Sequence, residues 1–158
     1  MSSNEMKNVF ISHFGKDDDS VQSLKKMLKS NGCILRNSSI DSTKPNDAKN
    51  PKYIEGLLRN GIRWAGSTVV LIGPETHKRK WVDWEIEQAN KHGKPIIGVF
   101  IQGAKDSDIP ENFQKYGDAL VGWNSGKIID AINGNCNDFV STDGKPWKSK
   151  YSIERSTC

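Results

Sequence analysis

The chain has 158 residues, 35% hydrophobic and 27% charged, a composition typical of one soluble globular domain. Its net charge of +4 combines 23 basic and 19 acidic residues, and only Lys78 to Lys80 forms a basic cluster, so we expect no nucleic-acid partner. No apolar leader and no run near the roughly 20 apolar residues of a membrane span occurs, so we expect no membrane association. Cys33, Cys136 and Cys158 are odd in number and lack metal-site spacing, which indicates reduced thiols and a cytoplasmic location.

The first fifty residues predict a strand, a helix, a second strand and a long loop. Residues 8–12 form a short apolar strand, and acidic residues then open a helix over 17–32 that ends at Asn-Gly. Residues 33–36 have the character of a second strand. Residues 37–50 are polar and contain Pro45, so we predict a loop of the long kind that is often functional.

The alternation of strands and helices continues through the rest of the chain. Three further strands are expected, over residues 67–73, 95–101 and 119–123. Helices are expected from Pro51 onward, over residues 81–92, and after Ser125, which is placed to cap the last one. The connection that precedes the fifth strand is polar and carries Pro110.

This alternation predicts an α/β fold, with a doubly wound, flavodoxin-like parallel sheet of five strands and helices on both faces. The expected strand order is 2-1-3-4-5. Ligands of such sheets bind beyond the carboxyl ends of the strands, where the order reverses between strands one and three. The loop from Ser12 to Gly15 and the helix over 81–92 both meet at this crevice, which is the expected functional site.

The domain is expected to cover residues 1–134. Residues 135–158 differ in character, because they are polar and are interrupted by Phe139, Trp147 and Tyr151. We predict a tail that these aromatic residues hold against the domain; an arm that binds a partner is the alternative.

Glu85 is the residue most suited to carry chemistry. On an ideal helix one apolar stripe collects Val82, Ile86 and Ala89, and the solvated face is expected to carry Asp83 and Glu87. Glu85 lies about 60° from Val82 around the helix axis, on the side of Trp81, so its carboxylate stands at the edge of the apolar surface. A carboxylate is costly to place there without a purpose. A helix-surface glutamate beside a core tryptophan is the alternative interpretation.

Other chemistries of this fold fit less well. Strand one ends in Ser12-His13 and strand three in Gly73-Pro74, so the acidic residues of a phosphoacceptor receiver are missing. The loop after strand one offers too few hydroxyls and glycines for a flavin phosphate site, and neither GxxxxGK[ST] nor GxGxxG occurs. Ser12, His13 and Asp17 lack the nucleophile elbow of a serine hydrolase.

Residues 9–17, Val-Phe-Ile-Ser-His-Phe-Gly-Lys-Asp, resemble the opening box of TIR domains, and residues 67–85, which end in Trp81-x-x-x-Glu85, resemble their third strand and catalytic helix. Residues 37–50 lie where TIR domains have their BB loop. The resemblance covers residues 7–134. Within the TIR domains the chain looks most like the TIR-like proteins of the bacterial Thoeris anti-phage system, of the ThsB kind.

This resemblance implies an enzyme that takes NAD as its substrate, needs no cofactor or metal, and releases nicotinamide to give ADP-ribose or a cyclic isomer. In Thoeris systems a phage-derived trigger leads the TIR protein to make a cyclic ADP-ribose signal, which an effector protein receives; TIR sites often also need self-association. The catalytic glutamate of the family maps onto Glu85 and its tryptophan onto Trp81. The loop that lines the NAD pocket maps onto Ser12, His13 and Phe14.

The chain departs from the family at two places. His13-Phe14 replaces a tyrosine or aromatic-arginine pair, and the loop over 37–50 carries no family signature; there Asn37, Ser39 or Asp41 is expected to contribute a substrate contact. Two alternatives remain open, namely a TIR interaction module without catalysis and a nucleoside-transferase-like enzyme that uses the same glutamate.

Overall fold

Five parallel strands form one sheet in the order β2-β1-β3-β4-β5, as the sequence predicts. The structure is a computed structural model, and it describes residues 5–37 and 51–146. The strands are β1 (Glu5–Ser12), β2 (Cys33–Asn37), β3 (Ser67–Ile72), β4 (Ile96–Phe100) and β5 (Ala119–Val121). The order reverses between β1 and β3, so the carboxyl ends of these two strands flank the expected crevice.

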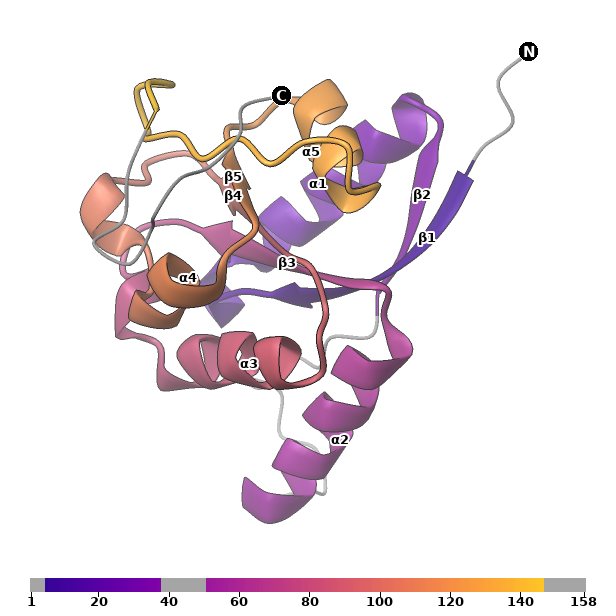
Figure 1. Ribbon diagram of the computed structural model, residues 1–158, viewed down its shortest axis with the longest axis vertical. Coiled ribbons are helices and arrows are strands. Elements are labelled where there is room, and N and C mark those ends of the chain that lie inside the picture. Colours follow the sequence, from indigo (N-terminus) through magenta and orange to yellow (C-terminus); the bar gives the residue numbers. More distant parts are fainter. Residues whose placement is uncertain (1–4, 38–50, 147–158) are drawn as a thin grey trace.

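Helices cover both faces of the sheet. They are α1 (Asp18–Ser30), α2 (Pro51–Trp64), α3 (Lys80–Lys91), α4 (Glu111–Tyr116) and α5 (Ser125–Ile132). Short 3-10 turns precede α1, α3 and α4, at η1 (Gly15–Asp17), η2 (Thr76–Lys78) and η3 (Asp106–Asp108). Figure 1 shows α1 and α5 on one side of the sheet and α2, α3 and α4 on the other. Among the described residues no helix has both the length and the apolarity needed to cross a bilayer.

The alternation of side chains along β1 decides which residues meet which helices. Val9 and Ile11 belong to the core beneath α1 and α5, whereas Phe10 belongs to the core beneath α2, α3 and α4. Successive side chains of a strand point to opposite faces, so Ser12 shares the face of Phe10. The last residue of β1 is therefore directed toward α3 by the register of the strand.

Three local expectations are corrected. Ser125 is not the cap of α5; Asn124 is, because its side chain accepts a hydrogen bond of 3.0 Å from the Lys127 backbone N–H. The polar connection before β5 contains a helix, α4, which begins directly after Pro110. Asp83 is not on a solvated face, because α4 covers it: both of its carboxylate oxygens and its carbonyl accept hydrogen bonds of 3.0 Å from Asn112.

Residues 135–146 continue along the edge of the sheet. Phe139 is buried and stacks on Phe113 of α4, with the ring centroids 5.7 Å apart. The backbone on either side of Phe139 makes hydrogen bonds of 2.8 and 3.1 Å to Leu120 of β5. Residues 147–158, with Trp147 and Tyr151, lie outside the described part of the chain, so the role of the tail stays a prediction.

Gly98 of β4 tests how tightly the α4 side of the sheet is packed. A Cβ at this position would lie 2.6 Å from Cζ of Phe113 and 2.8 Å from Cδ1 of Leu120, and the stacking of Phe113 on Phe139 hinders the ring from moving away. We expect Gly98→Ala to lower the free energy of unfolding by about 1–3 kcal/mol, measured by urea denaturation.

Gly56→Ala is the matched control, because nothing lies within 4 Å of the added Cβ and Gly56 is inside α2. The same change there should leave the free energy of unfolding unchanged or raise it by up to about 1 kcal/mol. Equal effects at the two glycines would contradict the packing described here.

Candidate functional site

Glu85 of α3 and Ser12 of β1 form a buried pair. The Ser12 hydroxyl donates a hydrogen bond of 2.6 Å to Oε1 of Glu85, across 73 residues of sequence. Ser12 is 1% exposed and Glu85 is 7% exposed, so both polar groups are shielded from solvent. As expected from the helical spacing, Val82, Ile86 and Ala89 are buried and Glu85 lies beside them. A carboxylate in such surroundings is placed at an energetic cost.

Burial perturbs the acidity of this carboxyl group. Loss of hydration raises the pKa of Glu85 from 4.5 to about 8, and the hydrogen bond from Ser12 opposes the rise in part by stabilising the charged form. Glu85 is therefore mainly protonated at neutral pH. A raised pKa in a carboxyl group near the topological switch point is typical of a functional residue.

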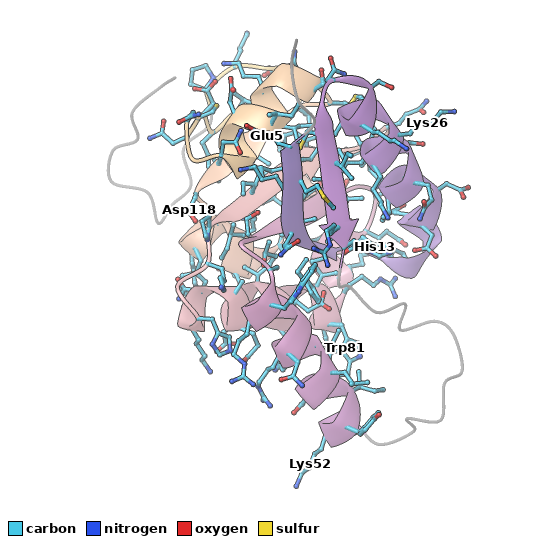
Figure 2. All side chains as sticks on the ribbon, turned by 90° about the vertical axis from the view of Figure 1, so that its right-hand side faces the viewer. Glu5, His13, Lys26, Lys52, Trp81 and Asp118 are labelled. Atoms are coloured by element: carbon cyan, nitrogen blue, oxygen red, sulfur yellow. The ribbon has the colours of Figure 1, made fainter. Side chains whose placement is uncertain are left out.

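A cavity of about 370 Å³ lies next to this pair. Its lining consists of two stretches, residues 13–15 after β1 and residues 78–82 at the start of α3. Figure 2 shows the labelled His13 and Trp81 on the same side of the molecule, toward the carboxyl ends of β1 and β2, whereas Glu5 marks the other end of β1. The cavity wall does not include Glu85 or Ser12; Glu85 lies one helical turn beyond Trp81, and Ser12 directly precedes His13.

Aromatic side chains form two parts of the cavity wall. Phe14 carries the guanidinium of Arg79 above its ring, with Cζ 3.9 Å from the ring centroid. Trp81 packs edge-to-face against Trp84, and their centroids are 5.5 Å apart. The guanidinium of Arg59 in turn lies 5.4 Å from the ring of Trp84. These contacts hold both walls in place, because aromatic pairs and cation–π contacts have preferred geometries.

The ring of His13, a residue of the cavity wall, is engaged by hydrogen-bond partners within the protein. Its Nε2 lies 2.7 Å from Oδ1 of Asp18, and its Nδ1 lies 3.2 Å from the carbonyl oxygen of Ile11. Both ring nitrogens therefore lie within hydrogen-bonding distance of oxygen atoms of the protein. The side chain is 6% exposed. It shapes the loop after β1 and offers little surface to a ligand.

Asn37 lies apart from the cavity wall. Its side-chain oxygen accepts a hydrogen bond of 3.1 Å from the Ile11 backbone N–H, so it continues the pairing of β1 with β2 past the end of β2. The structure thus gives Asn37 a contact with the chain itself. Ser39 and Asp41, the other residues considered in this loop, lie outside the described residues.

Sequence reasoning did not assign Arg79 to the site. The only signal was the basic cluster Lys78 to Lys80, which we judged too short to indicate a nucleic-acid partner. All three residues lie in the cavity wall, at the end of η2 and the start of α3. Over residues 5–37 and 51–146 no group of three or more histidine, cysteine, aspartate or glutamate side chains is arranged to hold a metal ion.

Solved structures with a similar fold include a conserved protein from Enterococcus faecalis V583 and the TIR domain of the Toll-related receptor TRR-2 from Hydra magnipapillata. The first has a TM-score of 0.57 and 14% sequence identity, over 82% of this chain and 99% of that chain. The second has a TM-score of 0.52 and 14% identity, over 80% of this chain and 92% of that chain. These similarities show that the fold is TIR-like.

Sequence comparison identifies relatives of a more specific kind. A protein of Bacillus cereus (strain MSX-D12) named "Putative cyclic ADP-D-ribose synthase ThsB1" is 39% identical over 62 residues, which are 38% of this chain and 32% of that relative. The match thus spans about a third of that relative's length. The family described as "Thoeris protein ThsB, TIR-like domain" matches residues 10–106, which contain Ser12, the cavity wall and Glu85. The chain therefore belongs to the ThsB family of TIR-like domains of the Thoeris system.

Proposed function

We propose that the chain is an enzyme that cleaves NAD, releases nicotinamide and makes a cyclic ADP-ribose-type signal, which activates an effector protein in anti-phage defence. The observation that carries the proposal is Glu85, a buried carboxyl group held by Ser12 next to a cavity at the switch point of the sheet. The name of the Bacillus cereus relative supports the same activity.

One carboxylate is sufficient for this reaction. The bond that breaks joins C1′ of the ribose to N1 of a cationic pyridinium, and its electron pair stays on nitrogen, so nicotinamide leaves as a neutral molecule and needs no general acid. Ordinary glycoside hydrolases require a second carboxyl group for that purpose. The remaining task is to stabilise positive charge that develops on C1′ and the ring oxygen. A fixed carboxylate in apolar surroundings does this more effectively than water.

The raised pKa of Glu85 fits a site that ionises as it binds its substrate. Glu85 in the protein alone favours its protonated form, because burial disfavours its charge. A nicotinamide cation placed beside it favours the carboxylate, since an opposite charge within about 4–6 Å lowers the pKa of a carboxyl group. Ser12 then keeps one oxygen oriented. The attraction of the nicotinamide cation thus offsets the energetic cost of ionising Glu85.

Cyclisation requires that a nucleophile of the same ADP-ribose attack C1′ before water does. The apolar cavity wall made by Phe14, Trp81 and Val82 supports this outcome, because exclusion of water suppresses the competing hydrolysis. Cyclisation forms the bond from C1′ to that nucleophile, and the proton displaced from it is released to solvent.

A TIR interaction module without catalysis is the second candidate. It is favoured by the position of Glu85, which is 7% exposed and is not part of the cavity wall. Under this candidate the Ser12–Glu85 pair joins β1 to α3 and has no chemical role. A nucleoside-transferase-like enzyme would use the same carboxylate on nucleosides and leave NAD intact.

Replacement of the carboxylate tests the proposal directly. We expect Glu85→Gln to lower NAD cleavage by at least about a hundredfold, because the amide keeps the shape but not the charge that stabilises the transition state. The measurement is nucleotide mass spectrometry of cells that express the wild type or the variant, with and without phage challenge. A species with the mass of ADP-ribose, less one water, should appear with the wild type only.

Glu87→Gln is the matched control, since Glu87 lies on the same helix and forms an ion pair with Lys91. Its nucleotide profile should equal that of the wild type. Full activity of folded Glu85→Gln protein would exclude the proposed chemistry. Loss of nucleosides with NAD intact would select the nucleoside enzyme, and unchanged nucleotides under every condition would select the interaction module.

The pH dependence of the reaction gives a second prediction. Because kcat/KM reports the free enzyme, it should rise with pH and level off above about 8, where Glu85 is ionised. Ser12→Ala removes the hydrogen bond that lowers this pKa, so the rising limb should shift to higher pH. Ser30→Ala, an exposed hydroxyl on α1, should not shift it. If Ser12→Ala does not shift the pH profile of kcat/KM, then ionisation of Glu85 does not control its rising part.

Stability should depend on pH through the same group. Folded Glu85 keeps a proton up to about pH 8, whereas the unfolded chain releases it near 4.5. The free energy of unfolding of the wild type therefore falls progressively as the pH rises from 4.5 to about 8. Glu85→Gln does not ionise, so its stability relative to the wild type should increase from pH 4.5 to 8 and then stay constant. Urea denaturation at four pH values measures this, and parallel curves would contradict it.

A further inference from the structure

The cations of the cavity wall have no role in the reaction as described so far. Lys78, Arg79 and Lys80 all line the cavity, and each occupies a position between η2 and the first residue of α3. No aspartate or glutamate is among the described residues that line the cavity, and the nearby Glu85 is mainly protonated at neutral pH. The outer part of the cavity is therefore strongly positive, which favours an anionic ligand.

Arg79 is held in a defined position at this rim. Its guanidinium stacks 3.9 Å above the centroid of Phe14, and its Nε is buried and makes no hydrogen bond within the described part of the chain. When a guanidinium stacks on an aromatic ring, its N–H donors lie in the guanidinium plane and stay free of the ring, so they can bind a ligand. Such an edge matches two oxygens of a phosphate.

The acidic residues that face this cluster do not neutralise it. Glu75 lies 3.8 Å from Arg79 and 3.6 Å from Lys78, and all three side chains are at least 41% exposed. Ion pairs with this exposure contribute little free energy and exchange readily for a better partner. Asp18 is engaged by His13 at 2.7 Å.

The start of α3 adds backbone donors to the same place. Arg79 is the N-cap residue, and its side chain makes no capping hydrogen bond. The first N–H groups of a helix have no intrahelical acceptor, and here they belong to Lys80, Trp81 and Val82, which line the cavity. Helix N-termini favour anions for this reason. The cations and these donors thus converge on one volume.

The spacing along α3 relates this volume to Glu85. Arg79 and Glu85 are six residues apart, about 9 Å along the helix axis. The cationic cluster and the carboxyl group thus lie at different levels of the same helix. A ligand with a cationic ring near Glu85 and a phosphate group near Arg79 matches the charge of each position.

We infer that Arg79, stacked on Phe14, is the anchor for the diphosphate of a dinucleotide, and that Lys78, Lys80 and the first amides of α3 complete this anion subsite. The inference rests on the proposed function and deepens it, because the subsite selects NAD against nucleosides that lack a phosphate. Phe14 is then a positioning residue for Arg79.

Binding measurements test the subsite without any chemistry. Isothermal titration of the wild-type protein with ADP-ribose and with adenosine should show saturable binding of ADP-ribose that weakens as salt concentration rises. Arg79→Gln should weaken ADP-ribose binding by about tenfold or more, because it removes charge-assisted hydrogen bonds, and should leave adenosine binding unchanged. Arg79→Lys should be intermediate, since it keeps the charge and loses the planar fork.

Arg63→Gln is the matched control, because Arg63 is an exposed arginine of α2 outside the cavity wall. It should bind ADP-ribose as the wild type does. Equal binding by Arg79→Gln and Arg63→Gln, or an equal loss for adenosine and ADP-ribose, overturns the inference, as does the absence of saturable ADP-ribose binding by the wild type. Arg79-dependent ADP-ribose binding in a protein that never consumes NAD would uphold the subsite and reject the proposed reaction.

Discussion

The hydrogen bond between Ser12 and Glu85 is the constraint on which the site depends. It joins the end of β1 to the second turn of α3, in surroundings where an unpartnered carboxyl group would be costly. Two features of the fold make the bond possible. The register of β1 directs residue 12 toward the α3 face, and parallel pairing of β1 with β3 brings the start of α3 to the end of β1. The sheet thus supplies the hydrogen-bond partner that allows one carboxyl group to be buried beside the apolar core.

The same arrangement separates two electrostatic environments within a short distance. Around Glu85 the protein is apolar and favours the neutral acid, whereas the residues just before α3 are cationic and open to solvent. The boundary between them is formed by Phe14 and Trp81. Phe14 orients Arg79 on the cationic side, and Trp81 is fixed by its edge-to-face contact with Trp84.

Much of the fold is encoded locally and was predictable. The apolar run of β3, the acidic start of α1 and the spacing of Val82, Ile86 and Ala89 each identify an element, and their alternation predicts the strand order. The errors have two causes, contact between distant segments and similar chemistry in neighbouring residues. Asp83 has the periodicity of a surface residue, but α4 packs over it. Asn124 rather than Ser125 caps α5, and neighbouring residues of similar chemistry are hard to tell apart from sequence.

The geometry of the candidate site was predictable in part, and the roles of its residues stay predictions. Helical spacing placed Glu85 at the edge of the apolar stripe, and the strand order brought the loop at Ser12 to the same crevice. Whether His13 faces a ligand depends on Asp18 and on the carbonyl of Ile11, and the position of Arg79 depends on the turn η2. Neither is visible in a pattern of residue types. Glu75, whose φ of 68° is left-handed although it is not a glycine, is the residue that redirects the chain into that turn.

The three hydrogen bonds between Asp83 and Asn112 have a consequence for how the Glu85 carboxyl group becomes accessible. They attach α3 to α4 at a point between Trp81 and Glu85, so a displacement of the helix would break all three at once. Rotation of an aromatic side chain breaks none of them. We therefore expect the carboxyl group to become accessible through rotamer exchange, which is fast, and not through collective helix motion on the microsecond-to-millisecond scale. A substitution at Asn112 would then convert a rigid support of α3 into a moving one without altering any residue of the cavity wall.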